Sequence, residues 1–528
     1  MLMMGQYVNP GSEKYQMRMN SKIFIDKTEL IIKTNEVINT GERYICISRP
    51  RRFGKTMAAE MLAAYYGNKE DTNTLFAELN IAKHSTYTKH LNKYNALMIN
   101  MQVFLSETTS IEEMLLKLQL DVGNELIEAN PEVRYKEKTN LRQIMTDLYL
   151  HTKCPFVILI DEWDCLFREY KDDLESQKKY LDFLRVLLKD QVYVGLAYMT
   201  GILPIKKYGS HSALNMFDEH SMIDSYNFIN YFGFTHAETK ALCIEFNMEM
   251  EEIKAWYNGY FIELNNPIYN PTSVTKSLLR KRLGSYWNKT ETYEALKDYI
   301  KLDIDELQNK ITRLIAGEHL KVNVYKFSND MRTFNSSDDV LALLIHLGYL
   351  SYCEQNNLVR IPNEEVKREF INSIEDLSGW ENIVDAIRNS DALLKAIWNE
   401  EEDVVADGIQ LIHEKSSSIL QYNDENSLSC ALNLALYTAS NYYTIIREFP
   451  SGKGFADLIF LPRKKHADKP AMIIELKWNK AAHGAISQIK NKHYPSILEE
   501  YHGNLLLVGL NYDKSNKIYD CLIEIYQI

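Results

Sequence analysis

Four short, almost wholly apolar runs separated by stretches of helical period constrain the fold of this chain most strongly. The runs are RYICIS (43–48), NALMINM (95–101), FVILID (156–161) and VYVGLAYMT (192–200). Continuous apolar character is typical of strands buried on both faces, whereas SIEEMLLKLQLDVGNELIEA (110–129) repeats its apolar residues at helical spacing. Strands that alternate with helices favour a parallel sheet with right-handed crossovers.

The chain has 528 residues, which is too long for one core, and its pattern changes twice. We predict a first α/β domain at 1–275, a helical and winged-helix-like region at 276–399 and a second α/β domain at 400–528. In the middle region, residues 336–370 read as helix, strand, strand and helix. In the last, GFADLIFLP (454–462), AMIIELKW (471–478) and NLLLVGLNY (504–512) are strand candidates.

The charge and apolar distribution limit the classes of function. The net charge of -12 argues against a protein coated for non-specific nucleic-acid binding, although one basic cleft is compatible with it. No run approaches the roughly 18 apolar residues of a membrane span, and the Met-rich start has no basic segment before an apolar one. We therefore expect a cytoplasmic protein without a membrane partner.

The stretch ISRPRRFGKT (47–56) ends like a phosphate-binding loop, whose usual form is G-x-x-x-x-G-K-[ST]. Gly54, Lys55 and Thr56 are in place between a strand and the helical MAAEMLAAYYG. A helix N-terminus offers unpaired N–H groups and partial positive charge, Lys55 adds a full charge, and the Thr56 hydroxyl suits Mg²⁺. The tripeptide alone is weak evidence.

The first half of this loop departs from the usual pattern, because Arg49 replaces the first glycine and Pro50 follows it. Loss of the glycine restricts the approach of the backbone to phosphate, and proline fixes one φ angle. The guanidinium groups of Arg49, Arg51 and Arg52 would compensate if they pair with phosphate oxygens. Alternatively, they are exposed and only raise the local positive potential.

A second motif changes the interpretation of the first. The apolar VILI run delivers Asp161 and Glu162 at its carboxyl end, where Asp161 can hold Mg²⁺ and Glu162 can orient or deprotonate an attacking water. A solvated acidic pair at a strand end is the alternative. The two motifs together, in order and on the expected elements, favour a nucleotide site. Thr200 at the next strand end is either a sensor of the γ-phosphate or a turn residue.

A third group of residues, near the C-terminus, suits divalent-metal chemistry. Asp457 lies in GKGFADLIF, and IIELKW supplies Glu475 and Lys477, which share one face of a strand. Two carboxylates and the intervening carbonyl suit Mg²⁺ or Mn²⁺, and the lysine can position or help deprotonate water for phosphodiester hydrolysis. An exposed E-x-K cross-pair is the alternative. From Arg447 to Ile528, twelve Lys and Arg outnumber nine Asp and Glu, a sign that favours a phosphate-backbone partner.

The blocks FIDKTELI, SRPRRFGKT, LIDEWD, TGILPI, WYNGYF with YNPTSV, and SYWNKT occur in this order over roughly residues 6–290. In these blocks the chain resembles the AAA-ATPase-like family of bacterial proteins, whose loops read RPRRFGKS or close to it. The resemblance implies a P-loop NTPase fold that binds ATP. It also implies that Arg49 and Pro50 are the family's own form of the loop.

The blocks GFADLIF, IIELKW, AISQIKNKHY and LLLVGLNYD over roughly 400–528 resemble the PD-(D/E)XK nuclease superfamily, in the branch fused behind AAA-ATPase-like domains. The resemblance implies that Asp457 and Glu475 bind the metal, that Lys477 is catalytic and that Gln488 supports the site together with Tyr494.

Two positions of this nuclease motif are open. The upstream glutamate of the superfamily corresponds to either Glu425 or Glu448. Phe455 occupies a position where relatives often carry arginine, so one backbone contact is in doubt.

These patterns lead to one main hypothesis and two rivals. The main one is an ATP-binding and ATP-hydrolysing enzyme with a Mg²⁺- or Mn²⁺-dependent nuclease that acts on DNA rather than RNA, as a possible homo-oligomer. The first rival is a nucleotide-gated switch whose nuclease fold only docks partners. The second is a DNA-binding regulator that uses the middle region, although EEVKREF (364–370) mixes both signs of charge.

Overall fold

The computed structural model describes residues 5–205, 214–224, 226–261, 267–287, 292–302, 304, 306–328, 331–420, 425–451, 454–491, 498 and 504–526. The protein divides into two compact units. The first comprises residues 1–289 and 321–366, and the second comprises 290–320 and 367–528. The domain boundaries near residues 275 and 399 stay predictions. They divide the chain into three contiguous segments, whereas each of the two units combines two separate segments.

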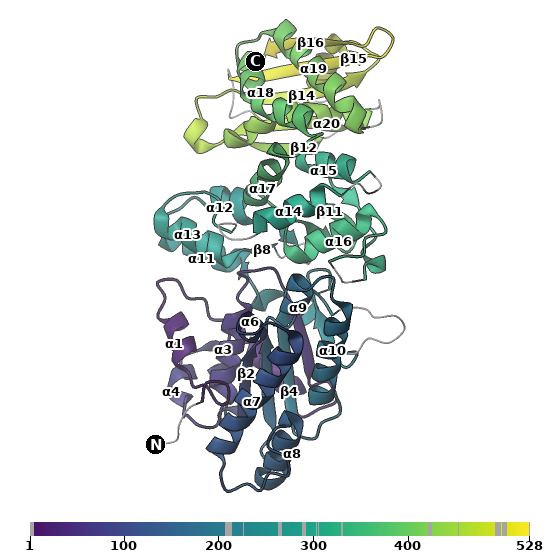
Figure 1. Ribbon diagram of the computed structural model, residues 1–528. Helices are drawn as coiled ribbons and strands as arrows, with labels where there is room; N and C mark the ends of the chain where they lie inside the picture. Colours follow the sequence, from purple (N-terminus) through teal and green to yellow (C-terminus); the bar gives the residue numbers. More distant parts are fainter. Residues whose placement is uncertain are drawn as a thin grey trace. The chain divides into compact units, whose positions relative to one another are not determined.

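A five-stranded, wholly parallel sheet forms the centre of the first unit (Figure 1). Its strand order is β2-β3-β4-β1-β5, with bounds β1 (Tyr44–Ser48), β2 (Asn95–Asn100), β3 (Phe156–Asp161), β4 (Val194–Gly201) and β5 (Asp218–His220). The four apolar runs form β1 to β4, which confirms the predicted strands and the parallel sheet. The short edge strand β5 has no such pattern. Because β4 lies between β1 and β3, the carboxyl ends of these three strands adjoin.

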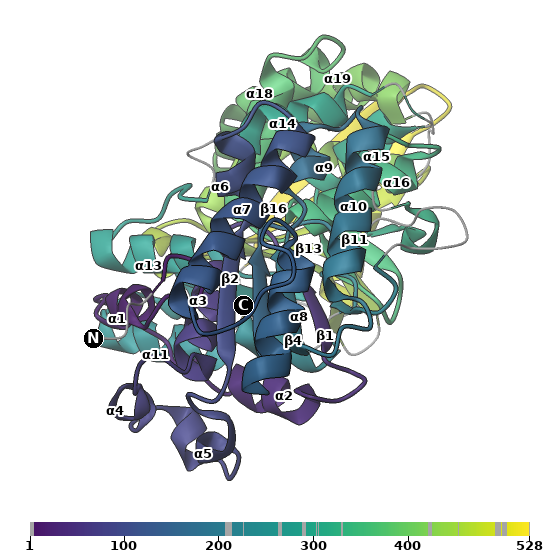
Figure 2. The same cartoon turned by 60° about the horizontal axis from the view of Figure 1, so that its bottom comes forward.

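Helices pack against this sheet. The helix after the loop, α3, packs against β2, β3 and β4, and its side chains share one core with alternate residues of β1, β3 and β4. Figures 1 and 2 show α7, α8 and α10 side by side over the sheet. The helices of this part are α1 (Glu13–Met19), α2 (Leu30–Val37), α3 (Lys55–Tyr66), α4 (Asn73–Phe76), α5 (Tyr87–His90), α6 (Met101–Ser106), α7 (Ile111–Ala129), α8 (Leu141–Thr152), α9 (Cys165–Glu169) and α10 (Leu174–Leu188).

The rest of the first unit contains two small sheets with short helices. One sheet has the order β6-β8-β7 and the other β10-β11-β9. The predicted order of helix, strand, strand and helix over 336–370 is confirmed by α16, β10, β11 and α17. The elements are β6 (Phe234–Thr235), α11 (His236–Glu245), α12 (Met250–Tyr257), β7 (Tyr260–Phe261), β8 (Pro267–Tyr269), α13 (Pro271–Arg280), α16 (Ser337–Leu347), β10 (Ser351–Cys353) and β11 (Leu358–Arg360). Two elements cross the boundary between the units, namely β9 (Leu320–Lys321) and α17 (Glu364–Glu375), most of which belongs to the second unit.

The second unit is built on a mixed five-stranded sheet of order β12-β13-β14-β15-β16. Only the β14–β15 pair is parallel, and helix α21 crosses between these two strands and packs on both. The elements are α14 (Thr292–Ile300), α15 (Leu307–Ile315), α18 (Glu381–Trp398), α19 (Glu402–Leu420), α20 (Glu425–Ala435), β12 (Tyr443–Ser451), β13 (Gly454–Pro462), β14 (Ala471–Trp478), α21 (Ala482–Asn491), β15 (Leu505–Asp513) and β16 (Ile518–Ile525). The fold is therefore multidomain α/β, as predicted.

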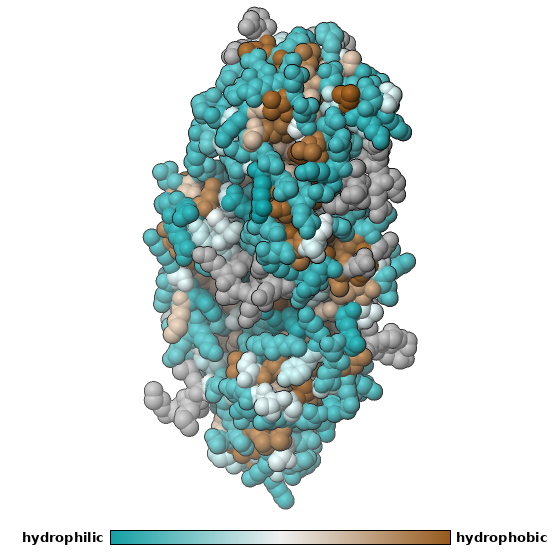
Figure 3. Space-filling view, turned by 45° about the horizontal axis from the view of Figure 1, so that its top comes forward, coloured by the Kyte–Doolittle hydropathy of each residue, from teal (hydrophilic) through white to brown (hydrophobic). Residues whose placement is uncertain are grey.

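The face of the molecule that Figure 3 shows is mainly hydrophilic among the coloured residues, with apolar residues in separated groups. Within the described ranges, every helix is too short or too polar to cross a lipid bilayer.

Candidate nucleotide and metal sites

The carboxyl ends of β2, β3 and β4 bring three polar side chains together in the first unit. The register pairs Asn100 with Asp161, and the register of β3 with β4 ends at Ile160 and Met199, one residue before Asp161 and Thr200. β3 and β4 are buried along their whole length and β2 is buried or half-buried. Apolar residues fill the middle of all three strands, and Asn100, Asp161 and Thr200 follow at their carboxyl ends. The sheet thus collects oxygen ligands at one edge.

The loop after β1 turns into α3 at Gly54, whose φ of 94° is in the left-handed region. A Cβ added at Gly54 would meet no atom within 4 Å, so the loop is open on that side. The buried Lys55 Nζ donates to the carbonyl oxygens of Arg49 at 2.8 Å and Pro50 at 3.0 Å. Burial lowers the pKa of this ammonium, and Glu162 and Asp161 oppose that effect. The loop therefore encloses a positive charge that an anion can share.

Asp161 lies at the centre of a hydrogen-bond network. Thr56 Oγ1 donates to Asp161 Oδ2 at 2.7 Å, Thr200 Oγ1 donates to Asp161 Oδ1, and Asn100 Nδ2 approaches Oδ2 at 3.4 Å. Burial raises the pKa of the Asp161 carboxyl, while the bonds from Thr200 and Thr56 oppose the increase. A buried carboxylate beside a hydroxyl, with its charge disfavoured, gains from a cation.

The residues around the loop fit Mg²⁺ and a nucleoside triphosphate. Thr56 and Asp161 are hard oxygen ligands of the kind that Mg²⁺ takes, and the open face of Gly54 leaves room for phosphate. Lys55 and the N-terminus of α3 supply the positive charge. The structure brings together Gly54, Lys55, Thr56, Asp161 and Thr200, all five of which the sequence singled out.

Arg49 is buried and directed into the sheet. Its Nη1 donates to the carbonyl oxygens of Ser48 and His220, each at 2.9 Å, and its guanidinium lies 5.6 Å from the centre of the Phe232 ring. Burial lowers its pKa to about 10. These contacts tie the loop to β1 and β5 and favour a structural role for Arg49. A phosphate contact stays a prediction.

Arg51 and Arg52 connect the loop to a distant segment of the first unit. Arg52 has a φ of 70° and donates through Nη1 to the Tyr286 carbonyl at 2.7 Å. The Arg51 carbonyl accepts from Trp287 Nε1 at 3.4 Å, and the buried Glu365 accepts from the N–H groups of Tyr286 and Trp287. Residues 285–287, the SYW block, and the start of α17 thus contact the loop at Arg51 and Arg52.

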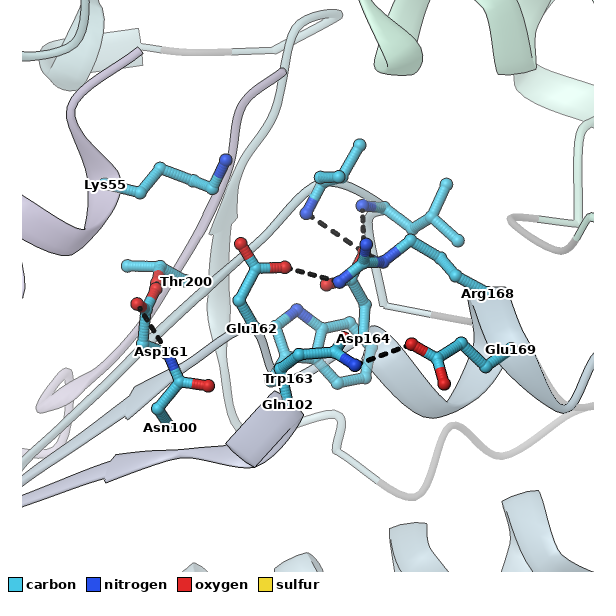
Figure 4. Close-up of polar contacts among 12 residues, drawn as sticks. Lys55, Asn100, Gln102, Asp161, Glu162, Trp163, Asp164, Arg168, Glu169 and Thr200 are labelled. Atoms are coloured by element: carbon cyan, nitrogen blue, oxygen red, sulfur yellow. Dashed lines mark hydrogen bonds and ion pairs between the residues drawn. The ribbon is translucent and has the colours of Figure 1, made fainter. Parts of the chain in front are cut away.

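Glu162 is held apart from Asp161 by the backbone. Its φ of 54° turns the chain after β3, and its carboxylate points between Lys55 and Arg168 (Figure 4). Arg168 forms an ion pair with Glu162 and a second one with Asp164, at 3.4 Å. The sequence motifs do not contain Arg168, and they contain Asp164 only as the last residue of the LIDEWD block, with no role assigned to it. The i, i+4 spacing of the two residues is a usable signal.

The nuclease-like residues gather where β13 and β14 diverge. Their register ends at Leu458 and Ile474, one residue before Asp457 and Glu475, and Asp457 Oδ2 accepts from the N–H of Leu476 at 2.6 Å. Glu475 is 2% exposed. Among the side chains that the structure describes, His, Cys, Asp and Glu form no group of three that could hold a metal ion. The donors present are thus two carboxylates and the Leu476 carbonyl.

Two further predicted residues contact Glu475. Lys477 Nζ lies 2.9 Å from Glu475 Oε1, and Gln488 Nε2 of α21 donates to the same oxygen. The donors fit a hard cation that leaves open positions for water, because such ions take oxygen ligands and keep several waters. A bound Mg²⁺ or Mn²⁺ would supply a water of lowered pKa and charge for the phosphodiester oxygens.

Several sequence-based assignments are not covered by this geometry. Tyr494 lies outside the described residues. The side chains of Glu425, Glu448 and Phe455 are likewise not described, so the choice of the upstream glutamate stays open.

Together these features define the class of each domain. A parallel sheet with a GKT loop at β1 and an acidic end at β3 is the architecture of a P-loop nucleotide-binding domain, and the second sheet carries a D…ExK motif. Residues 11–210 match the family model described as "Predicted AAA-ATPase". Residues 423–520 match the model of the PD-(D/E)XK nuclease superfamily. The chain therefore carries an AAA-ATPase-like domain followed by a PD-(D/E)XK superfamily domain.

Comparison with individual proteins adds little on function. An uncharacterized protein in the vnfD 5′ region of Azotobacter chroococcum mcd 1 is 24% identical over 359 residues, which cover 65% of this chain. The chain spans 64% of the length of that relative. The structure of the Aeropyrum pernix ORC2 protein in ADPNP–ADP complexes matches with a TM-score of 0.30 and 11% identity, over 68% of this chain and 97% of that one.

Proposed function

We propose that the protein binds and hydrolyses ATP at the 47–56 loop and cleaves phosphodiesters, in DNA rather than RNA, at its C-terminal domain under nucleotide control. The observation that carries the ATP part is the bond of Thr56 to Asp161, which joins the loop helix to the acidic strand end at 2.7 Å. Magnesium sites of P-loop NTPases use this combination of hydroxyl and carboxylate.

In the proposed ATPase reaction each residue has a defined task. Lys55 exchanges its two loop carbonyls for phosphate oxygens, and Thr56 and Asp161 hold the Mg²⁺ that accompanies ATP. Glu162 orients the attacking water and accepts its proton. Thr200, at the end of β4, senses the γ-phosphate, and its hydroxyl is linked to Asp161 by a hydrogen bond.

The nuclease part rests on the cluster around Glu475. Asp457 and Glu475 lie on adjacent strands and hold the cation, Lys477 positions the attacking water, and Gln488 fixes one oxygen of Glu475. A binding module that only docks partners has no need of a buried glutamate beside a lysine. The excess of basic residues after Arg447 supports a polyanionic substrate.

The test uses the purified full chain. ATP binding and phosphate release are measured with and without Mg²⁺, and cleavage is measured on single- and double-stranded DNA and RNA with ATP and metal varied independently. We expect K55A to lose nucleotide binding. We expect D457N and E475Q to lose cleavage, whereas D468N, an exposed carboxyl change in the β13–β14 loop, cleaves like wild type.

The alternative is a nucleotide-gated switch with a non-catalytic nuclease fold. The alternative needs only the nucleotide-binding residues Lys55, Thr56 and Asp161, whose contacts would serve ATP binding without turnover equally well. Tight ATP binding with no cleavage of any substrate in Mg²⁺ or Mn²⁺ would favour the switch and overturn the nuclease proposal.

A further inference from the structure

We infer that Arg168 is a positioning residue for ATP hydrolysis, which fixes the Glu162 carboxylate beside the phosphate-binding lysine. The inference rests on the proposed ATPase function and adds a residue that neither motif contains. Four observations support it: the backbone of Glu162, the two ion pairs of Arg168, the anchoring of Asp164 and the second oxygen of Glu162.

The backbone of Glu162 is in an unfavourable conformation. Its φ of 54° is in the left-handed region, which costs a residue other than glycine of order 1–3 kcal/mol and persists only where the surroundings impose it. Left to itself, this residue would relax and move its carboxylate. Arg168 opposes that movement, because it forms an ion pair with Glu162 Oε2.

Arg168 is itself fixed by Asp164. Asp164 is fully buried, and its Oδ2 accepts from the N–H groups of Ile202 and Leu203, directly after β4, at 3.0 and 2.8 Å. The Arg168 Nε lies 3.4 Å from the same oxygen. Burial alone would lower the pKa of the Arg168 guanidinium, but Asp164 and Glu162 outweigh it and raise that pKa. The guanidinium therefore stays charged between two carboxylates.

Helix α9, which carries Arg168, is also anchored at its end. Glu169 Oε1 accepts from Gln102 Nε2 of α6 at 2.6 Å (Figure 4). The chain of contacts thus runs from the segment after β4 through Asp164 and Arg168 to Glu162.

The contact leaves the reactive side of Glu162 available. Arg168 engages Oε2, and among the described residues no hydrogen bond or ion pair reaches Oε1. Figure 4 shows the Glu162 side chain between Lys55 and Arg168. If Arg168 inhibited Glu162 as a base, we would expect it to bind both carboxylate oxygens. A contact to one oxygen aims the other at a water near the phosphates.

The experiment measures kcat and KM for ATP hydrolysis, and Kd for ATP, in the full chain. The variants are R168Q and R168K, with R185Q as the matched control, because Arg185 pairs with Asp182 on the exposed side of α10. We expect R168Q to lower kcat roughly ten- to a hundredfold, as loss of an orienting partner or a ~1 Å misplacement does, with KM and Kd within about threefold of wild type. R168K restores part of kcat, since an ammonium replaces the charge but not the fork.

The outcomes separate this inference from the function on which it rests. A wild type that binds ATP without hydrolysing it overturns both. An active wild type whose R168Q form keeps or exceeds the wild-type kcat overturns the inference alone, as does a rise in KM with unchanged kcat. If R168Q does not fold, R168K decides: we expect kcat roughly three- to tenfold below wild type at unchanged KM, and a wild-type kcat overturns the inference.

Discussion

Thr56 and Asp161 are 105 residues apart in the chain, yet Thr56 Oγ1 donates a hydrogen bond to Asp161 Oδ2 at 2.7 Å. The other carboxylate oxygen of Asp161 accepts from Thr200. Both oxygens are therefore engaged from two different elements, α3 and β4. The oxygen ligands of the proposed Mg²⁺ site are thus in place without a conformational change of the strands.

The first prediction concerns the Thr56 hydroxyl. We expect T56A to weaken Mg²⁺-dependent ATP binding by roughly ten- to a hundredfold, because a hydrogen bond to a charged group is worth ~1.5–3 kcal/mol. T56S keeps the hydroxyl and should bind within about threefold of wild type. Titration with a fluorescent ATP analogue, with and without Mg²⁺, measures both. Equal affinities for T56A and wild type in Mg²⁺ would contradict the role of this hydroxyl.

The second prediction concerns the free energy of unfolding of the nucleotide-free protein. Burial raises the pKa of Asp161, so the folded state holds this proton more tightly than the unfolded state. The contribution of this carboxyl to stability is therefore fully present below its unfolded pKa and is lost as pH rises through its folded pKa. At neutral pH we expect D161N to be more stable than wild type by roughly 1–2 kcal/mol, while it loses Mg²⁺–ATP.

Urea unfolding of wild type and D161N from about pH 4 to pH 8 checks this sign. The difference between the two proteins should shrink as pH falls, because the wild-type carboxyl becomes protonated. A D161N variant that is less stable than wild type at every pH would show that hydrogen bonds from Thr56 and Thr200 outweigh the cost of burial.

The third prediction concerns Arg52. Its guanidinium donates to the Tyr286 carbonyl at 2.7 Å, which connects the loop to the SYW block. We expect R52A to bind ATP within about threefold of wild type but to exchange the amides of residues 284–287 faster, since one bond of ~1–3 kcal/mol is lost. Hydrogen–deuterium exchange of the full chain measures this. A large loss of ATP affinity in R52A would instead identify Arg52 as a phosphate ligand.

Much of the fold could be predicted because burial on both faces leaves a clear mark in the sequence. The runs that became β1 to β4 are continuous and apolar, and their bounds match to within two residues at each end. The edge strand β5 has three residues of sequence DEH, and only its pairing with β1 makes it a strand. The pairing of an edge strand depends on residues far away in the sequence, so no local pattern predicts it.

The residues of the candidate nucleotide site differ in how far the sequence alone indicates their roles. Gly54, Lys55 and Thr56 have the spacing of a phosphate-binding loop, and Asp161 stands at the end of an apolar run, so the two motifs together indicate them. The role of Arg49 does not follow from its type, because its bonds to Ser48 and His220 depend on where β5 lies. An arginine in a loop suggests phosphate, and only the packing shows that this one faces backbone carbonyls.

The last prediction concerns the buried pair of Glu475 and Lys477. Their side chains are 2% and 13% exposed, and Lys477 Nζ lies 2.9 Å from Glu475 Oε1. Removal of Lys477 takes the positive charge away from the buried Glu475 carboxylate, so we expect K477M to destabilise the protein by ~3–5 kcal/mol in metal-free buffer. The double variant K477M/E475Q removes both charges and should recover most of that loss, because a neutral pair does not need the missing partner.

Urea unfolding of wild type, the two single variants and the double variant gives the coupling energy between the two side chains. Mg²⁺ should stabilise K477M more than wild type, since the cation replaces the lost ammonium beside Glu475. A double variant no more stable than K477M would mean that Lys477 acts by packing and not by charge.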